Sequence, residues 1–497
     1  MKNKTKIKVE KDFIISEVDN RLFGSFLEHM GRAIYTGIYE PTHPSADKNG
    51  FRKDVIELIK ELEVDIVRYP GGNFLSGYEW TDGIGPKENR PKKLDLAWRT
   101  IESNQFGINE FMDWSRKTNV KVMGAVNLGT GTPKDAANLI EYCNFKGGTY
   151  WSDLRKEHGY NEPHNIKVWC LGNEMDGPWQ ICHLDADDYG KKARETAKMM
   201  KWIDETIELV VCGSSGPLMP TFPEWDRKVL EYTYDQVDYI SLHRYYENFG
   251  NDLDFLASFA DFDKFIKTII ATVDYVKALK RSNKTINLSF DEWNIWYLSK
   301  VKVKDWEEAP EILEDNYSLL DALVMGGLVI TLLKNSDRVK MGCLAQLVNV
   351  IAPIFTEKDG KAIKQTIFYP FKYFAKYGKG EALTTFINSS KVETKYGAVN
   401  EVEAVTVLNK EKKEVTLFVL NINLNNKIDT DIDLNGFGKL EGIEHIILDG
   451  DDLHMKNNFE NPEAVKPRII KLDDKKNKIS IPKCSFNVLR YKIKEEL

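Results

Sequence analysis

The 497-residue sequence has few cysteines, no long apolar run and no excess of basic charge. Its six cysteines are widely scattered and form no Cys-x-x-Cys pair. This predicts reduced, mostly buried thiols rather than a disulfide framework or a zinc site. The longest apolar stretch, residues 322–332, is shorter than the about 20 apolar residues that span a bilayer. We therefore expect a buried helix there and no membrane segment.

The charge balance is mildly acidic, with 69 Lys and Arg against 76 Asp and Glu and a formal net charge of −7. Nucleic-acid phosphates require a basic face, so we expect no nucleic-acid partner. The first residues are rich in lysine but lead into no apolar segment, which is unlike a secretory signal. A cytoplasmic location is the resulting expectation.

Motifs for a metal, a phosphate-bearing cofactor or a serine nucleophile are also missing. His158, His164 and His183 lack the helical His-Glu-x-x-His spacing of a zinc site. Residues 213–216 (GSSG) are not a Gly-x-Ser-x-Gly nucleophile elbow, and residues 449–452 (DGDD) lack the further oxygen ligands of a calcium loop. No metal and no organic cofactor is expected.

The main feature present is an alternation of short apolar runs with amphipathic stretches between about residues 20 and 350. This pattern is typical of a parallel sheet with crossover helices. The predicted strands cover residues 23–30, 65–70, 121–128, 167–171, 208–213, 237–243, 286–290 and 341–346. Eight such repeats predict an α/β fold, a (β/α)8 TIM barrel over residues 18–383. A doubly wound sheet fits less well, because no glycine-rich phosphate loop follows the first strand.

The pattern changes after residue 383. Residues 402–408, 414–421, 443–448 and 478–488 are β-rich and are separated by Asn, Asp, Gly and Lys clusters. They predict a second, smaller domain, an antiparallel β-sandwich over residues 384–497. Residues 1–17 precede the barrel, and we expect them to add a strand to this sandwich.

Polar side chains repeatedly follow the apolar runs of the predicted barrel, where the strand ends of this fold build the active site. They are Glu28, Arg68, Asn127, Asn173, Glu174, His243, Tyr245, Glu292 and Gln346. Two of them, Glu174 and Glu292, could flank a sugar's anomeric carbon, as glycosidic bond cleavage requires. A single strand-end glutamate is more often an ion-pair partner. From the residues alone, glycosidase chemistry and other barrel chemistries remain equally open.

Several longer segments narrow this choice, because together they resemble the α-L-arabinofuranosidases of glycoside hydrolase family 51, in clan A of the retaining glycosidases. The resemblance covers effectively the whole chain. Its segments are 23–29 (FGSFLEH), 67–74 (VRYPGGNF), 172–174 (GNE), 241–246 (SLHRYY), 291–294 (DEWN), 345–353 (AQLVNVIAP) and 368–371 (FYPF).

The resemblance implies a role for each matching residue. Glu292 would be the nucleophile and Glu174 the acid/base, donating a proton to the leaving group and later accepting one from water. Arg68 and Tyr245 would contact Glu292, while Asn173 would bond the sugar 2-hydroxyl. Glu28, Asn73 and Gln346 would bond the other hydroxyls, and Trp296 and Trp98 would form apolar walls.

The implied activity is exo-acting removal of arabinofuranose from arabino-oligosaccharides and arabinoxylan fragments, and family members are commonly hexameric homo-oligomers. A β-xylosidase or endoglucanase of the same clan is the alternative that keeps the mechanism and changes the substrate. A carbohydrate-binding protein with an inactive barrel would need a defect that the two glutamates do not suggest. The sequence leaves the linkage preference open.

Overall fold

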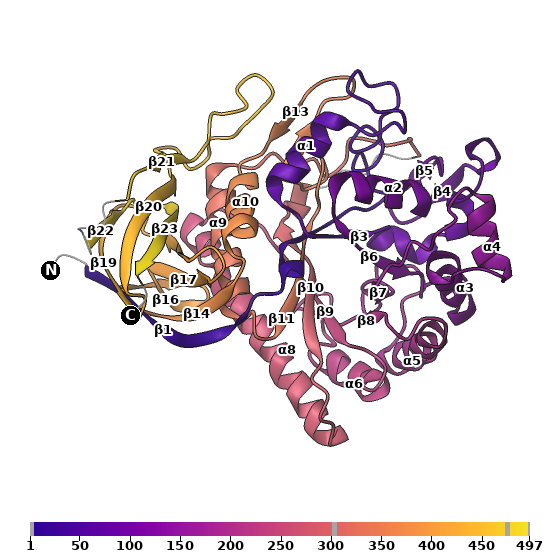
Figure 1. Cartoon of the computed structure of the whole chain (residues 1–497), viewed down its shortest axis with the longest axis horizontal. Coiled ribbons are helices and arrows are strands. Elements are labelled where there is room, and N and C mark those ends of the chain that lie inside the picture. Colours follow the sequence, from indigo (N-terminus) through magenta and orange to yellow (C-terminus); the bar gives the residue numbers. More distant parts are fainter. Residues whose placement is uncertain (1–3, 301–305, 473–477, 496–497) are drawn as a thin grey trace.

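A computed structural model describes residues 4–300, 306–472 and 478–495. The chain forms a barrel wrapped by helices and, beside it, a curled β-sheet that contains both ends of the described chain (Figure 1). Helices α9 (Leu319–Lys334) and α10 (Phe368–Tyr377) lie in the region between these two parts.

The barrel is closed by eight parallel strands, so the predicted TIM barrel is confirmed. In chain order they are β2 (Gly24–Phe26), β3 (Ile66–Tyr69), β6 (Lys121–Val126), β7 (Val168–Leu171), β8 (Glu208–Val211), β9 (Tyr239–Tyr246), β10 (Asn287–Ile295) and β11 (Val339–Ala345). Each predicted range contains or overlaps one of them. β9 and β10 are longer at their C-terminal ends than predicted, so Tyr245 and Glu292 lie within strands.

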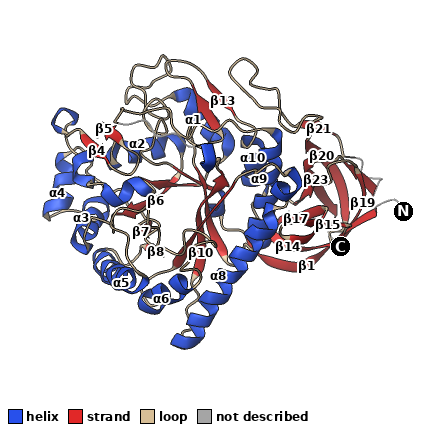
Figure 2. Cartoon of the chain, turned by 180° about the vertical axis from the view of Figure 1, so that it is seen from behind, coloured by secondary structure: helices blue, strands red, loops and turns tan. Residues whose placement is uncertain are grey.

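Helices cover the outside of the barrel (Figure 2). In α1 (Lys53–Leu62), Val55, Ile56, Ile59 and Leu62 are buried, as expected for one apolar face at i, i+3 and i+4 spacing. The others are α2 (Ile108–Thr118), α3 (Pro133–Asn144), α4 (Tyr150–Glu157), α5 (Ala186–Ile203), α6 (Glu224–Thr233), α7 (Asp252–Leu256) and α8 (Ser258–Lys280).

Helix α9 contains the longest apolar run of the sequence and has no polar face. All of its residues from Leu319 to Leu333 are buried, because it packs against the barrel on one side and the second sheet on the other. At Gly326 an added Cβ would lie 2.5 Å from the Phe486 ring, so the missing side chain lets the helix approach the sheet closely. No helix among the described residues is long and apolar enough to cross a membrane.

The second part is mostly β-structure, as predicted, and forms one curled nine-stranded sheet. Its order is β21 (Arg468–Ile470), β20 (Lys439–Leu448), β23 (Ser485–Glu495), β18 (Glu414–Asn421), β17 (Val402–Asn409), β14 (Glu381–Asn388), β1 (Lys4–Glu17), β19 (Ile428–Asn435) and β22 (Lys478–Ile481). The β1 strand pairs antiparallel with β14 but parallel with β19, so the sheet is not wholly antiparallel. The exact domain boundaries stay a prediction.

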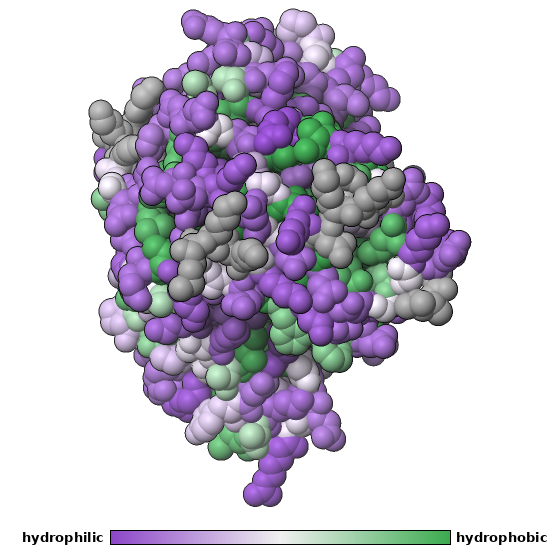
Figure 3. Space-filling model, turned by 90° about the vertical axis from the view of Figure 1, so that its left-hand side faces the viewer, coloured by the Kyte–Doolittle hydropathy of each residue, from purple (hydrophilic) through white to green (hydrophobic). Residues whose placement is uncertain are grey.

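Both faces of the central strands β17 and β18 are buried, which explains why these strands are nearly continuously apolar. Alternate residues point to opposite faces. Val405 and Phe418 join the core shared with α9 and the barrel, whereas Ala404 and Leu417 belong to a separate core inside the curl. The surface at the second-sheet end of the molecule consists mainly of hydrophilic side chains, with smaller apolar groups between them (Figure 3).

Three short two-stranded ribbons complete the β-structure. They are β4 (Lys93–Asp95) with β5 (Thr100–Glu102), β12 (Ile354–Thr356) with β13 (Ala362–Lys364), and β15 (Lys391–Thr394) with β16 (Gly397–Asn400). Of these, the β4–β5 ribbon belongs to the loop after β3, which carries Asn73 and Trp98 toward the C-terminal face of the barrel.

Candidate active site

Glu174 lies just beyond β7, where the backbone turns sharply. Gly172 has φ +87° and Glu174 itself has φ 44°, so two residues of this turn adopt the left-handed region. Both Glu174 oxygens accept hydrogen bonds from side chains. Oε1 lies 2.9 Å from His243 Nδ1, and Oε2 accepts from Trp179 Nε1 at 2.7 Å. The turn thus aims the carboxylate across the barrel toward β9.

Glu292 lies in β10 and is almost completely buried. Arg68, from β3, donates to its Oε1 at 2.5 Å, and the Tyr245 hydroxyl, from β9, donates to its Oε2 at 2.8 Å. The side chain is therefore fixed in one orientation by groups from two other strands.

The two glutamates are close neighbours. A carboxylate oxygen of Glu174, a ring nitrogen of His243 and a carboxylate oxygen of Glu292 all lie within 4.8 Å of one another. Retaining glycosidases hold their two carboxyl groups about 5–5.5 Å apart, whereas inverting enzymes need about 6.5–9.5 Å to admit a water. The close approach of the two carboxyl groups in this chain is therefore on the retaining side of this division.

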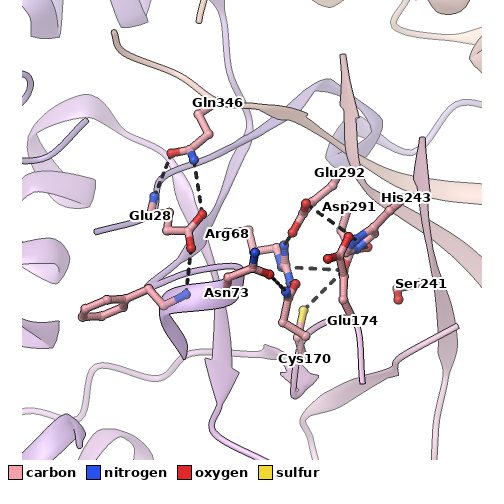
Figure 4. Close-up of polar contacts among 12 residues, drawn as sticks. Glu28, Arg68, Asn73, Cys170, Glu174, Ser241, His243, Asp291, Glu292 and Gln346 are labelled. Atoms are coloured by element: carbon pink, nitrogen blue, oxygen red, sulfur yellow. Dashed lines mark hydrogen bonds and ion pairs between the residues drawn. The ribbon is translucent and has the colours of Figure 1, made fainter. Parts of the chain in front are cut away.

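His243 connects the two glutamates to a third acid. Its Nε2 lies 3.2 Å from Asp291 Oδ1, and its Nδ1 lies 3.6 Å from Glu292 Oε2 in addition to the contact with Glu174 (Figure 4). Burial by itself would lower the pKa of His243, but the surrounding carboxylates of Glu292, Asp291 and Glu174 raise it to about 10.

This protonation also bears on metal binding. Glu174, His243 and Glu292 offer a nitrogen and two oxygens at a spacing that could hold a cation. A histidine binds a metal through a deprotonated nitrogen, however, and the pKa of His243 is about 10. A metal ion would therefore have to displace the proton of His243 to bind here.

Asp291 is fully buried beneath the glutamates and is held by the same cations. Its Oδ2 lies 3.7 Å from Arg68 Nε and 3.5 Å from Cys170 Sγ. Burial opposes ionisation of this carboxyl, but Arg68 and His243 outweigh it and lower the pKa of Asp291. It is therefore a fixed negative charge behind His243.

Arg68 lies at the centre of the site and links Glu292 to the polar amides. A second guanidinium nitrogen donates to Asn173 Oδ1 at 2.7 Å, and the guanidinium lies 4.7 Å from the centroid of the Phe26 ring. Asn173 Nδ2 in turn lies 3.4 Å from Asn73 Oδ1. Asn73 and Asn173 are thus placed next to each other at the mouth of the barrel.

Glu28 and Gln346 form the opposite wall of the site (Figure 4). Gln346 receives the Glu28 backbone N–H at 3.0 Å and donates to its Oε2 at 3.3 Å. The Phe74 N–H and the Trp98 indole N–H both donate to Glu28 Oε1 at 2.9 Å. Burial raises the pKa of Glu28 to about 8, although these two donors oppose the shift.

The two predicted apolar walls are placed differently. Trp296 packs edge-on against Tyr245, with 5.0 Å between the ring centroids, and so lies on the Glu292 side. Trp98 lies on the Glu28 side through its indole contact. The structure thus gathers all of the predicted site residues on one face of the barrel; their chemical roles remain predictions.

No role was predicted for three residues of the site: His243, Asp291 and Trp179. The sequence contained a partial signal for two of them, since His243 ends an apolar run and Asp291 immediately precedes Glu292. Trp179 lies in the irregular segment between β7 and α5, where no periodic pattern indicates its direction. Only the folded chain brings its indole to Glu174.

Known proteins resemble this chain over almost its whole length. Residues 58–282 match the α-L-arabinofuranosidase 1 domain, and residues 291–485 match the α-L-arabinofuranosidase C-terminal domain. The intracellular exo-α-(1→5)-L-arabinofuranosidase 1 of Bacillus subtilis (strain 168) is 56% identical over 93% of each chain. The intracellular exo-α-(1→5)-L-arabinofuranosidase of Acetivibrio thermocellus is 53% identical, over 98% of this chain and 99% of that protein.

Solved structures agree with these matches. A family 51 α-L-arabinofuranosidase from Bifidobacterium longum has a TM-score of 0.94 and 43% identity, covering 98% of this chain and 99% of that one. The arabinose complex of an α-L-arabinofuranosidase from Thermotoga maritima has a TM-score of 0.88 and 33% identity, covering 99% and 100%. By sequence and by fold, the chain belongs to the α-L-arabinofuranosidases of glycoside hydrolase family 51.

Proposed function

We propose that this protein is a retaining, exo-acting enzyme that hydrolyses terminal α-L-arabinofuranosyl residues from arabino-oligosaccharides and arabinoxylan fragments by double displacement. The observation that carries the proposal is the proximity of Glu174 and Glu292, whose side-chain oxygens lie within 4.8 Å. Relatives named exo-α-(1→5)-L-arabinofuranosidases favour the α-(1→5) linkage as the preferred one.

In the first displacement, a Glu292 oxygen forms a bond to the anomeric carbon as the bond from that carbon to the leaving oxygen breaks. Glu174 gives its proton to the leaving oxygen and becomes a carboxylate. The bonds from Arg68 and Tyr245 support this role for Glu292, because they hold the carboxylate in one orientation before it attacks.

In the second displacement, a water attacks the anomeric carbon and the bond from this carbon to Glu292 breaks. Glu174 takes a proton from the water and returns to its acid form, while Glu292 regains its carboxylate. Two inversions at the same carbon restore the α-configuration, so the released arabinose keeps the stereochemistry of the substrate.

The remaining polar groups bind the sugar. Asn173 bonds the 2-hydroxyl, and Glu28, Asn73 and Gln346 bond the others. The buried position of Glu28, Asn173 and Gln346 supports this assignment. Buried polar groups discriminate strongly against ligands that lack the matching hydroxyl, because such a ligand leaves them without a partner. Trp296 covers an apolar face of the ring.

We place the activity inside the cell, on short oligosaccharides that have been imported, since the Bacillus, Acetivibrio and Halalkalibacterium relatives are named intracellular enzymes. We also propose that the protein is a homo-oligomer, and specifically a hexamer. Light scattering coupled to size-exclusion chromatography should give about six times the chain mass of 57.2 kDa; a monomer would contradict the assembly.

The test of the activity is kcat/KM on nitrophenyl α-L-arabinofuranoside and nitrophenyl β-D-xylopyranoside, measured side by side. We expect a preference for the furanoside of at least about 100-fold, because a missing hydroxyl contact in a polar site is penalised strongly. A preference for the xyloside would favour the β-xylosidase alternative and would contradict the sugar assignment, although it would leave the two glutamates in place.

Linkage is tested next, with α-(1→5)-, α-(1→3)- and α-(1→6)-linked arabinofuranosyl disaccharides. The comparison is needed because a Bifidobacterium longum relative that is 48% identical is named an exo-α-(1→6)-L-arabinofuranosidase. We expect the highest kcat/KM on the α-(1→5) disaccharide. A higher value on the α-(1→6) compound would contradict that preference.

A further inference from the structure

His243 is the one histidine among the site residues and has no part in the two displacements described above. It lies in β9 and is buried between Glu174, beyond β7, and Asp291 and Glu292 in β10. In the described part of the chain, only the His243 ring contacts both of the proposed reacting glutamates and also a third carboxylate, that of Asp291.

The geometry of these contacts limits the protonation states that the ring can adopt. Nδ1 lies 2.9 Å from Glu174 Oε1, and Nε2 lies 3.2 Å from Asp291 Oδ1. A neutral imidazole has one N–H donor and one acceptor, whereas an imidazolium has two donors. When both acids are carboxylates, only the imidazolium can donate to both at once.

Resting on the proposed function, we propose that His243 is a positioning residue that carries a positive charge through the whole cycle and thereby couples the protonation of Glu174 to the state of Glu292. Asp291 anchors this cation from behind. The role differs from that of Arg68, whose hydrogen bonds reach Glu292 and Asn173 but not Glu174.

The reason for such a cation follows from the charges in each state. In the free enzyme, Arg68 and His243 are positive, Asp291 and Glu292 are negative, and Glu174 holds its proton, so the charges of these five groups sum to zero. When Glu292 is bonded to the sugar it becomes neutral, and Glu174 has given its proton to the leaving group and become negative. The sum is zero again. Buried charges are stable only when they are balanced in this way.

The other charged groups near His243 do not replace it. Asp176, in the turn after Glu174, is buried and accepts from the Ser215 backbone N–H at 3.0 Å. Burial raises the pKa of Asp176 to about 6, and the Glu174 charge adds to the rise. From β9 itself, Tyr245 faces Glu292 as a neutral donor. His243 is thus the cation that contacts Glu174.

The first test is the pH profile of kcat/KM for His243→Asn, a variant that keeps a neutral N–H donor in place of the charged ring. Loss of a positive charge makes neighbouring carboxyls harder to ionise. The acidic limb, where Glu292 must lose its proton, and the alkaline limb, where Glu174 must keep its proton, should therefore both move to higher pH. A contact at this distance should shift them by about one to three pH units.

A purely structural role would lower kcat/KM at every pH and leave the limbs where they are, so unmoved limbs would overturn the proposal. The matched control is His445→Asn in β20, whose ring is buried and contacts Asn487 at 2.9 Å in the second sheet. Its profile should equal that of the unchanged protein. Turnover of the arabinofuranoside by the unchanged protein tests the proposed function separately, so the two failures are distinguishable.

A second measurement remains decisive even if His243→Asn does not fold. The chain has eight histidines, few enough for their ring nitrogens to be followed by ¹⁵N NMR in the full-length protein. We expect one ring to remain doubly protonated through neutral pH. Trapping the covalent state with a 2-fluoro-arabinofuranosyl fluoride should leave that ring doubly protonated at neutral pH, because Glu174 becomes negative as Glu292 becomes neutral. A ring that is neutral at pH 7 in the free enzyme would overturn the proposal.

Discussion

The barrel rim and the second sheet bury polar side chains in opposite ways. At the rim, charged groups from β3, β7, β9 and β10 converge on one another, with Arg68 and His243 set among Asp291, Glu174 and Glu292. In the sheet, the buried faces are mainly apolar, and buried polar side chains are bonded to one partner nearby, as in His445 with Asn487 and Glu403 with Lys334. The rim keeps charges that a stable core would exclude, which indicates selection for chemistry there and for packing in the sheet.

The largest effect on activity is expected for a change of Glu292 at the barrel rim. We expect Glu292→Ala to lower kcat about 10⁴-fold or more on every arabinofuranoside, because no group remains to form the covalent bond. Initial rates on an aryl and on a disaccharide substrate give the measurement. Appreciable residual turnover would contradict its role as nucleophile.

The matched control for this variant is a buried glutamate of the second sheet. Glu403, in β17, contacts Lys334 of α9 at 2.9 Å. Glu403→Ala should leave kcat and KM unchanged, because its charge serves the junction between helix and sheet. A fall in kcat similar to that of Glu292→Ala would show that loss of a buried carboxylate acts through folding.

The next largest effect is expected at Glu174, and it should depend on the leaving group. Glu174→Ala should lower kcat/KM about 10²- to 10⁴-fold on an arabinobiose, whose leaving alcohol needs a proton. On nitrophenyl α-L-arabinofuranoside the first displacement should change far less, because nitrophenolate leaves without protonation. Equal losses on both substrates would argue against an acid role.

The smallest effect on activity is expected for a change in the sheet core. Phe486 packs against Gly326 of α9 and stacks on Phe418 with 6.3 Å between the ring centroids. Phe486→Ala should lower the free energy of unfolding by about 3–5 kcal/mol through the cavity it leaves. Calorimetry should show a lower Tm, while kcat of the folded enzyme stays the same. A large fall in kcat at temperatures where the variant is folded would show that the sheet also shapes the site.

The barrel was predictable from the sequence because its periodic signal is strong. Buried parallel strands give short apolar runs, and their polar C-terminal residues mark the functional face. Glu174 and Glu292 could therefore be assigned to one face from the sequence alone. The strand lengths were less accurate, because β9 and β10 continue through polar residues such as Tyr245 and Glu292 that are buried only in the assembled site.

The contacts between strands were beyond prediction. Hydrophobic alternation says which residues are buried but not which strand lies beside which, so the parallel pairing of β1 with β19 could not be foreseen. The same limit hid the position of His243, whose partners come from β7 and β10. Trp179 depends on the path of an irregular loop, which leaves no period in the sequence.

The position of β1 also affects how the chain can fold during synthesis. Lys6 pairs with Asn388 in β14 and with Asp431 in β19, so the first strand is placed only after most of the chain exists. Contacts so distant in sequence slow folding, because a long loop must close before they form. Until β14 and β19 have been synthesised, the backbone N–H and C=O groups of β1 have no partner strand and could pair with another chain. The positive charges of the lysines at positions 6, 8 and 11 oppose such pairing with other chains until β1 has joined the sheet.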